Sequence, residues 1–429
     1  MKVAVIGAGW AGIAAAVELA GHGARPTLYE AAGVGGGRAR RIEWNGHVLD
    51  NGAHILLGAY RETLALMARV GAPQDALMRL PLRVKIPGRL DLAAPDLPAP
   101  LHLLVALLTA RGLAWRERFA AIRFARALRA MRFRVSPDVT VAALLAAHEQ
   151  GGTLANLLWN PLCVAALNTP ASRASAQVFV NVLRDSLFAD RASSEMLLPR
   201  RNLSAALPDP ALSWLAAHGA EVKLRTRVRG LRSNAGALVV EADSEETYSH
   251  VVCAVGPHQF GDVTAGLPAL AALRESVAAL EYESITTVYL GYAGSVRQDA
   301  PMTGLVDGPL QWLFDREAIA GERGLLAGLV SASARVEHRD QQGLAVESHR
   351  QLCRELAPLP EPAWSKVVTE RRATFACVPG AFRAPARTPV AGLVLAGDHT
   401  EGDYPATIEG AVRSGMRAAR IVLQEQGLQ

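Results

Sequence analysis

The first forty residues constrain the fold more than any other part of the 429-residue chain. A β-rich run at residues 2–6 leads directly into a G-x-G-x-x-G turn, helical composition follows over residues 11–20, and a second apolar run at 26–29 ends on Glu30. Such glycines permit a tight turn, close approach of the backbone to a pyrophosphate and close helix–strand packing, while the helix N-terminus offers N–H groups to phosphates. The sequence therefore predicts a dinucleotide site whose turn is Gly7, Ala8, Gly9, Trp10, Ala11 and Gly12.

An acidic residue occurs at the position where a dinucleotide-binding motif usually has one. Glu30 lies 18 residues after Gly12, close to the roughly 20-residue spacing of the acidic residue that binds an adenosine ribose. We therefore expect Glu30 to bind the ribose of a dinucleotide.

A second glycine cluster, at residues 35–37, precedes Arg38. A guanidinium group matches phosphate oxygens in geometry and charge, so we expect Arg38 to bind the pyrophosphate. The alternative is a solvent-exposed arginine, one of many in this chain.

The last forty residues contain a third candidate segment. Gly397 and Asp398 follow an apolar strand at 393–396, and open α/β sheets bind ligands at the carboxyl ends of their strands. Pro405 is placed to start the final helix, whose N-terminus can stabilise negative charge on a cofactor. An ordinary helix start would have the same pattern.

Length and composition favour a folded protein of two domains. The chain is long for one core, and 50% of its residues are hydrophobic while 20% are charged. The net charge of +5 reflects an arginine-rich composition, and no nucleic-acid-binding motif accompanies it. The four cysteines form no C-x-x-C pair, so we expect no metal site and no disulfide framework, as suits a reducing cytoplasm.

Two segments bear on membranes. The run at 101–110 is shorter than the roughly 18 apolar residues that span a bilayer, so we expect a soluble or peripheral protein. Residues 111–134 hold eight arginines and one acid between apolar side chains, which is typical of a helix on a membrane surface. We therefore expect a cytoplasmic protein that associates peripherally with the inner face of the membrane; the alternative is a solvated charged face on a cap helix.

The elements suggest a discontinuous organisation. We assign residues 1–80, 205–260 and 390–429 to the dinucleotide domain, and 81–204 and 261–389 to a substrate domain with a helical region at 101–190. Strand-like runs at 221–231, 237–242 and 248–255 predict an antiparallel meander whose last strand rejoins the parallel sheet. Residues 42–49 predict one strand, and the proline-rich stretch 81–100 predicts irregular structure.

These features resemble the flavin-containing amine oxidase and phytoene desaturase superfamily. More specific segments resemble one family within it, the hydroxysqualene dehydroxylases of bacterial hopanoid biosynthesis. They are LDNGAHILLGAY (49–60), LWNPLC (158–163), ALNTP (166–170), ASAQVF (174–179), QWLFDR (311–316) and YPATIEGA (404–411). Ala53 departs from the family, which usually carries Gln there, and this puts in doubt only the side chain beside His54.

The resemblance implies an α/β fold in which a discontinuous Rossmann-like FAD-binding domain is joined to a mixed α+β substrate domain with a helical cap. It implies FAD as the cofactor. The sequence shows no second nucleotide fingerprint and no iron–sulfur spacing, so we expect an external electron donor, and its histidines show no metal-ligand spacing, so we expect no metal. The FAD-binding positions that it adds to the glycine turn and Glu30 are Ala31, Gly36, Gly37, Arg38, Asn51, Gly52, Ala53, His54, Val228, Gly256, Gly397, Asp398, Ala406, Thr407, Ile408 and Ala411.

The implied reaction removes the hydroxyl group of hydroxysqualene and delivers a hydride from reduced FAD, giving squalene. A long apolar isoprenoid then needs an apolar tunnel that excludes water, and the Leu/Ala/Phe-rich region 101–190 is suited to build it. A carotenoid-type desaturase, an amine oxidase and a flavoprotein that uses FAD only structurally are the alternatives.

Loss of the hydroxyl group as water needs a proton donor. His54 is our first candidate, because it follows a strand end and its ordinary pKa suits neutral pH. Asp315 is the second, although pairing with Arg316 would explain it equally well. A bound water or the flavin itself could also donate the proton.

Overall fold

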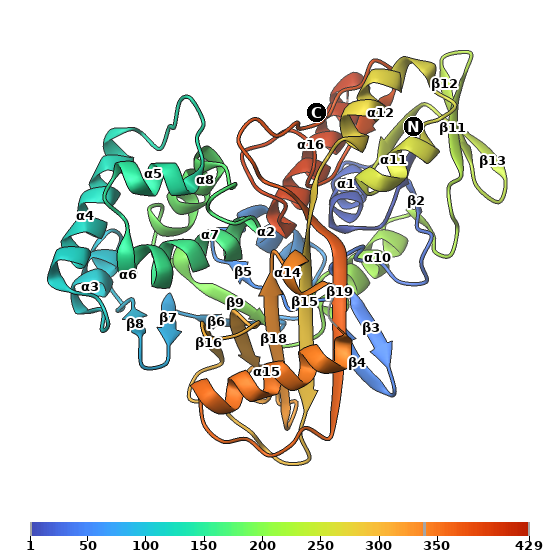
Figure 1. Cartoon of the computed structure of the whole chain (residues 1–429). Coiled ribbons are helices and arrows are strands. Elements are labelled where there is room, and N and C mark those ends of the chain that lie inside the picture. The colour runs from blue at the N-terminus through green and yellow to red at the C-terminus, as the bar shows by residue number, and fades with distance from the viewer. Residues whose placement is uncertain (1, 338–339, 428–429) are drawn as a thin grey trace.

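The computed structural model describes residues 2–337 and 340–427. Figure 1 shows three parts: a parallel sheet with its helices at the upper right, an antiparallel sheet below it, and a helical lobe at the left. The two chain ends lie close together beside the parallel sheet.

The parallel sheet collects its strands from distant parts of the chain. Its strands, in spatial order, are β10 (Glu221–Lys223), β2 (Thr27–Tyr29), β1 (Val3–Ile6), β14 (His250–Cys253) and β20 (Leu393–Leu395). All four pairings are parallel, and β1 is buried along its whole length. Burial on both faces explains why β1 and β20 are continuous apolar runs, whereas the edge strand β10 carries two charged residues.

Alternate residues of β1 serve two different cores. Val3 and Val5 belong to the cluster formed with helices on one face, whereas Ala4 and Ile6 belong to the cluster on the other, as the two-residue period of a strand requires. On the first face, Gly415 allows α16 to approach α1, because a Cβ atom there would lie 2.0 Å from a main-chain oxygen of α1. The helices of this part are α1 (Trp10–Gly21), α2 (Arg61–Arg69), α9 (Leu203–Ala206), α10 (Pro208–Ala217) and α16 (Ile408–Glu425).

The second face of the parallel sheet is covered by a small antiparallel sheet and short helices. These elements are β11 (Gly230–Asn234), β12 (Ala237–Glu241), β13 (Glu245–Tyr248), α11 (Pro257–Val263), η3 (Pro268–Leu270) and α12 (Ala271–Ala278). An antiparallel meander is present, but its third strand is β13, which was not predicted. The run predicted at 248–255 is β14, which lies in the parallel sheet as expected. The strand predicted at 221–231 is two strands, however, because a left-handed residue, Arg225, turns the chain between β10 and β11.

The second large sheet is antiparallel and carries α15 on one face (Figure 1). Its strands, in spatial order, are β16 (Met302–Gly304), β17 (Trp312–Asp315), β18 (Leu325–Ser331), β15 (Tyr282–Gly291) and β19 (Trp364–Phe375). The helices beside it are α13 (Arg316–Ala320), α14 (Ala334–Glu337) and α15 (Gln341–Glu355).

The helical lobe confirms the helical composition expected from residue 101 onwards. Its elements are α3 (Leu101–Thr109), α4 (Trp115–Ala130), α5 (Val141–Ala147), α6 (Gly152–Leu154), the π-helix η1 (Ala155–Trp159), α7 (Asn160–Leu167), α8 (Ala176–Leu187) and η2 (Ala192–Ser194). Within the described residues, no helix is long and apolar enough to cross a membrane.

Two local predictions were wrong because short hairpins were overlooked. The strand predicted at 42–49 is a hairpin, since Asn45 and Gly46 both take positive φ angles, which is the two-residue turn that Asn-Gly favours. The stretch predicted as irregular at 81–100 contains a second hairpin, in which Gly88 supplies the positive φ of the turn. The small pairs and ribbons are β3 (Arg41–Trp44) with β4 (His47–Asp50), β7 (Arg83–Ile86) with β8 (Leu90–Ala93), and β5 (Leu56–Leu57), β9 (Met196–Pro199) and β6 (Leu77–Leu80).

Candidate cofactor-binding and active site

The glycine turn after β1 has the geometry of a phosphate cradle. Gly7 has a φ of +98°, and a Cβ atom there would lie 2.8 Å from the Ala254 carbonyl oxygen. A Cβ atom at Gly12 would lie 1.8 Å from the Gly7 carbonyl oxygen, so only glycine lets α1 pack this closely on the strand. At Gly9 the nearest atom would be 4.0 Å away, so this glycine leaves room for a ligand at the helix N-terminus.

The N-terminus of α1 is free to bind an anion. Gly9 is the N-cap residue and supplies no side-chain acceptor, so the first N–H groups of the helix, including those of Trp10 and Ala11, have no capping oxygen. The Trp10 indole is buried and donates to the Ala39 carbonyl oxygen at 3.0 Å, which fixes it in the core.

Glu30 lies at the end of β2, beside the glycine turn. Its carboxylate accepts hydrogen bonds from the main-chain N–H groups of Ala8 and Ala32, both at 2.8 Å. Ala31, between Glu30 and Ala32 in the sequence, is exposed. Each carboxylate oxygen can accept more than one bond, so Glu30 retains acceptor capacity for ribose hydroxyl groups. The Gly36 N–H group donates to the Ala8 carbonyl oxygen at 2.8 Å, which holds the second glycine cluster against the first.

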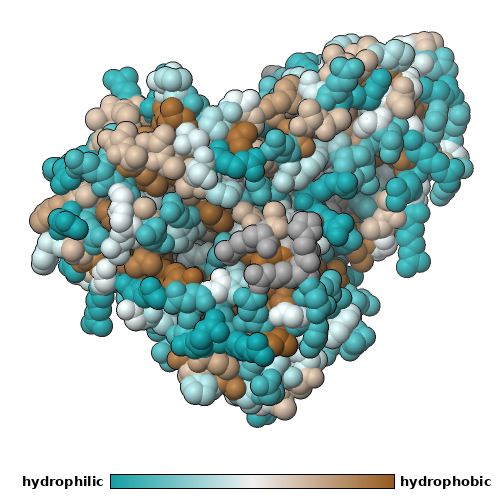
Figure 2. Space-filling model, viewed as in Figure 1, coloured by the Kyte–Doolittle hydropathy of each residue, from teal (hydrophilic) through white to brown (hydrophobic). Residues whose placement is uncertain are grey.

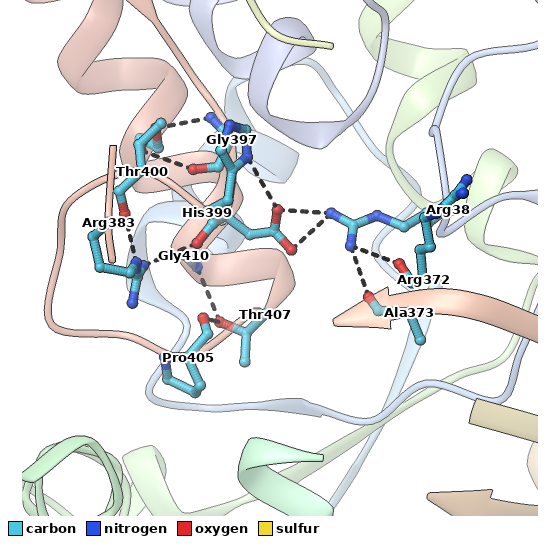
Figure 3. A network of polar contacts seen from close by, with 12 residues as sticks. Arg38, Arg372, Ala373, Arg383, Gly397, His399, Thr400, Pro405, Thr407 and Gly410 are labelled. Carbon is cyan, nitrogen blue, oxygen red and sulfur yellow. Dashed lines mark hydrogen bonds and ion pairs between the residues drawn. The ribbon is translucent and has the colours of Figure 1, made fainter. Parts of the chain in front are cut away.

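Arg38 and Asp398, 360 positions apart in the chain, form an ion pair in which Nη2 of Arg38 lies 2.7 Å from both carboxylate oxygens (Figure 3). Arg38 also donates to the carbonyl oxygens of Arg372 and Ala373 at the end of β19. Burial alone would raise the pKa of Asp398, but Arg38 and His399 hold that pKa below its ordinary value. The guanidinium expected to pair with phosphate therefore has a carboxylate partner, which ties the two predicted segments together.

Sequence reasoning missed Arg383, which organises the loop after Asp398. Its guanidinium donates to the Thr400 carbonyl oxygen (Figure 3) and to the carbonyl oxygens of Asp398 and Tyr404. Burial lowers the pKa of Arg383. No motif marks this arginine in the sequence, since its acceptors are all main-chain oxygens.

The final helix begins later than predicted. Thr407 is its N-cap, and the Thr407 hydroxyl accepts from the Gly410 N–H group at 3.1 Å. Pro405 precedes the cap rather than starting the helix, because Thr407 supplies the capping oxygen that proline lacks. The remaining predicted positions of this segment, Ala406, Ile408 and Ala411, are partly buried around the helix start.

The loop after β4 joins the ion pair to the second sheet. The Asn51 side chain donates to the Arg38 carbonyl oxygen at 3.1 Å and to Glu370 at 3.2 Å. The Ala53 N–H group donates to the Thr287 hydroxyl at 3.2 Å, and Gly52 lies between these anchors. The loop is thereby fixed between Arg38 and strand β15.

His54 is partly buried, and its Nδ1 donates to the Gly52 carbonyl oxygen at 2.7 Å. Burial lowers the pKa of His54, and the nearby charge of Arg38 lowers it further. A lowered pKa favours the neutral imidazole, which weakens the argument for His54 as a proton donor. Its catalytic role stays a prediction.

Asp315 serves as a helix cap. Its carboxylate accepts from the Ala318 N–H group at the start of α13 and from the Gln298 N–H group. Arg316 pairs with Glu322 rather than with Asp315. These bonds give Asp315 a structural task and leave the catalytic assignment without geometric support.

Two predicted positions lie around the parallel sheet. Gly256 caps α11 directly after β14, at the carboxyl edge that also holds the glycine turn. Val228 is buried in the core cluster that covers the outer face of that sheet. In the part of the chain that the structure describes, no group of three metal-ligating side chains is assembled.

Residues 10–423 match the family model described as flavin containing amine oxidoreductase. A hydroxysqualene dehydroxylase of Rhodopseudomonas palustris is 32% identical over 98% of both chains, and one of Sinorhizobium fredii is 30% identical over 99% of both. A probable zeta-carotene desaturase of Synechococcus elongatus is 26% identical over the full length of both.

The solved structures agree on the fold. The crystal structure of an oxidoreductase from Methanosarcina mazei has a TM-score of 0.78 and covers 98% of this chain and 100% of its own, at 14% identity. The chain therefore shares its overall fold with this solved structure.

Proposed function

Because the chain belongs to the flavin-containing amine oxidoreductase family, and is an FAD-dependent oxidoreductase, we propose that it removes the hydroxyl group of hydroxysqualene to give squalene. The observation that carries this proposal is the end-to-end likeness to hydroxysqualene dehydroxylases at up to 32% identity. A carotenoid-type desaturase is the second candidate, supported by lower identity over the same length.

The cradle around Gly9 fits FAD. We assign the pyrophosphate to the open space at Gly9 and the N-terminus of α1, and the adenosine ribose to Glu30. The Arg38–Asp398 pair and the N-terminus of α16 are assigned to the flavin half of the cofactor. Bound FAD in its reduced form supplies the hydride that replaces the hydroxyl group.

The protein has to hold a long apolar chain and keep water away from an allylic cation. The core of the helical lobe is built from Leu, Ala and Phe side chains, among them the buried Phe124 and Phe179. Ala406, just before α16, packs against this same cluster. We therefore propose that the isoprenoid chain binds against this lobe, close to the start of α16.

The electron donor is external in this proposal, since the chain carries one dinucleotide fingerprint.

The substrate also suggests that the protein acts at a membrane, because a C30 isoprenoid dissolves in lipid. Four of the seven large hydrophobic residues that the described chain exposes lie on α3 and α4: Leu101, Leu104, Trp115 and Phe119. Figure 2 shows hydrophobic residues at the surface of this lobe, at the left, beside hydrophilic ones.

Arginines surround this exposed apolar surface. Arg111, Arg116, Arg123 and Arg126 are exposed, and Arg118 lies 4.5 Å from the centre of the Trp115 ring. Aromatic and basic side chains together suit the interface of an anionic membrane. These side chains support the proposal that the protein docks through α3 and α4 on the cytoplasmic face of the membrane.

Product analysis tests the activity. The purified flavoprotein is reduced anaerobically, given hydroxysqualene, and its extract is analysed by mass spectrometry. Squalene formed in proportion to the flavin reoxidised supports the proposal. A desaturase would leave hydroxysqualene unchanged and would instead reduce its oxidised flavin when given a saturated isoprenoid segment.

A further inference from the structure

We propose that Asp50 is the proton source for the reaction, and that His54 positions the leaving hydroxyl group. The inference rests on the proposed function, which needs an acid. In the step, the carbon–oxygen bond breaks, the oxygen keeps the electron pair and takes the Asp50 proton, and water leaves. Hydride from the reduced cofactor completes the carbon, and the Asp50 carboxylate regains a proton from solvent.

The geometry begins with a small cavity between β4 and the second sheet. Asp50, Ala53, His54, Tyr289 and Arg316 are among the residues that line it, and its volume is about 30 Å³. A cavity of this size has room for about one water or one hydroxyl group. Asp50 and His54 both line this space, so we place the leaving hydroxyl group between them.

Asp50 is held so that it keeps a proton near neutral pH. Burial raises the pKa of Asp50 to about 7, while the Leu203 N–H group and Arg316 act against burial and Glu322 acts with it. The Tyr289 hydroxyl donates to the Asp50 carbonyl oxygen at 2.9 Å, which fixes the strand end. An ordinary aspartate, with a pKa of about 3.9, would have no proton to give.

His54 complements this acid as an acceptor. Because Nδ1 donates to the Gly52 carbonyl oxygen, the neutral ring presents the lone pair of Nε2. A lone pair there can accept the hydroxyl hydrogen of the substrate and hold its oxygen for protonation. The Asn51 side chain, on the same loop as His54, donates to the Arg38 carbonyl oxygen, and Arg38 pairs with Asp398. The loop that carries His54 therefore contacts the predicted cofactor site.

The protonation state is measurable without turnover. Infrared difference spectra of the FAD-loaded protein, recorded between about pH 5 and pH 9, report the carbonyl stretch of protonated carboxyl groups. A band that titrates near pH 7 is expected in the wild type and absent in Asp50→Asn. Glu283→Gln is the matched control, because burial also raises the pKa of Glu283 and that residue does not line the cavity. A band near pH 7 that persists in Asp50→Asn would overturn the proposal.

Single-turnover kinetics test the role. Asn keeps the acceptor for the Leu203 N–H group, so we expect normal FAD content and melting temperature in Asp50→Asn. Reoxidation of the reduced enzyme by hydroxysqualene should slow by at least about 100-fold, the lower end of general acid contributions. The wild-type loss of rate above about pH 7 should disappear in this variant. A rate within threefold of wild type, with the wild-type pH profile, would contradict the assignment.

A second variant keeps the proposal testable if Asp50→Asn does not fold. Glu322 raises the pKa of Asp50 and its side chain is partly exposed, so Glu322→Gln should shift the falling limb of the pH profile to lower pH. An unshifted limb would argue against Asp50 as the acid. If the wild type itself forms no squalene, the proposed function fails, which is a separate result.

Discussion

At the residue scale, Glu30 carries the most specific assignment of the cofactor site. Its carboxylate is already oriented by the Ala8 and Ala32 N–H groups. Glu30→Arg replaces an acceptor by a cation that cannot accept bonds from ribose hydroxyl groups, and we expect most of the bound FAD to be lost. Flavin absorbance per mole of purified protein measures this.

Glu43→Arg is the control for that experiment, since Glu43 is exposed on β3 and the same charge is introduced away from the cradle. We expect full flavin content in this variant. Equal flavin content in the two variants would remove Glu30 from the site.

Asp398 makes a prediction about pH. Arg38 and His399 hold its folded-state pKa below the ordinary value, so the ion pair contributes stability above the unfolded pKa of about 3.9 and loses it as pH falls through the lower folded value. The difference in melting temperature between the wild type and Asp398→Asn should be constant from about pH 5 to pH 8 and shrink below about pH 4. A difference that grows on acidification would contradict this account.

At the scale of elements, Glu409 of α16 forms hydrogen bonds that link this helix to α2. Its buried carboxylate accepts from the N–H groups of Glu62 and Thr63 and from the Thr63 hydroxyl at 2.7 Å. Glu409→Gln replaces one carboxylate oxygen by an amide NH2 group, which cannot accept a hydrogen bond. We therefore expect the free energy of unfolding to fall by about 2 kcal/mol. Urea denaturation compares it with Glu401→Gln, whose carboxylate is exposed; equal midpoints would show that the link is not stabilising.

Helices, strands and turns could be predicted where the local backbone conformation requires a particular residue type. The glycines of the first turn fix β1, α1 and their packing, because larger residues would clash there. Asn45-Gly46 is an equally local turn signal, and the hairpin it forms was missed because the apolar run around it reads as one strand. Thr407 is also a local signal for a helix N-cap. The proline signal instead predicts a helix start at Pro405, two residues before the observed cap.

The site could be predicted less completely than the fold. Arg38 and Asp398 were both recognised from their motifs, but their pairing joins positions 360 apart and no spacing rule connects them. The state of His54 and Asp50 depends on burial among side chains from several elements, which no local pattern encodes. Asp315 was a candidate only because its motif is specific, and the structure uses it as a cap.

At the scale of the whole molecule, the exposed surface of α3 and α4 predicts membrane docking. Trp115 and Phe119 are 62% and 51% exposed, and each basic residue near an anionic surface contributes about 1 kcal/mol. The protein should float with anionic liposomes at low salt and be released at high salt. The Trp115→Ser/Phe119→Ser double variant should lose most of this binding, whereas Val346→Ser, at a surface valine on α15, should not. Equal flotation with neutral and anionic liposomes would refute the electrostatic part.

The most direct test of the central claim follows the hydride. The enzyme is reduced in heavy water, so that the exchangeable hydrogen at flavin N5 becomes deuterium, and is mixed anaerobically with unlabelled hydroxysqualene. The account predicts squalene carrying one deuterium at the carbon that bore the hydroxyl group, formed in step with flavin reoxidation. Unlabelled squalene, or a flavin that stays reduced while hydroxysqualene is recovered, would contradict it.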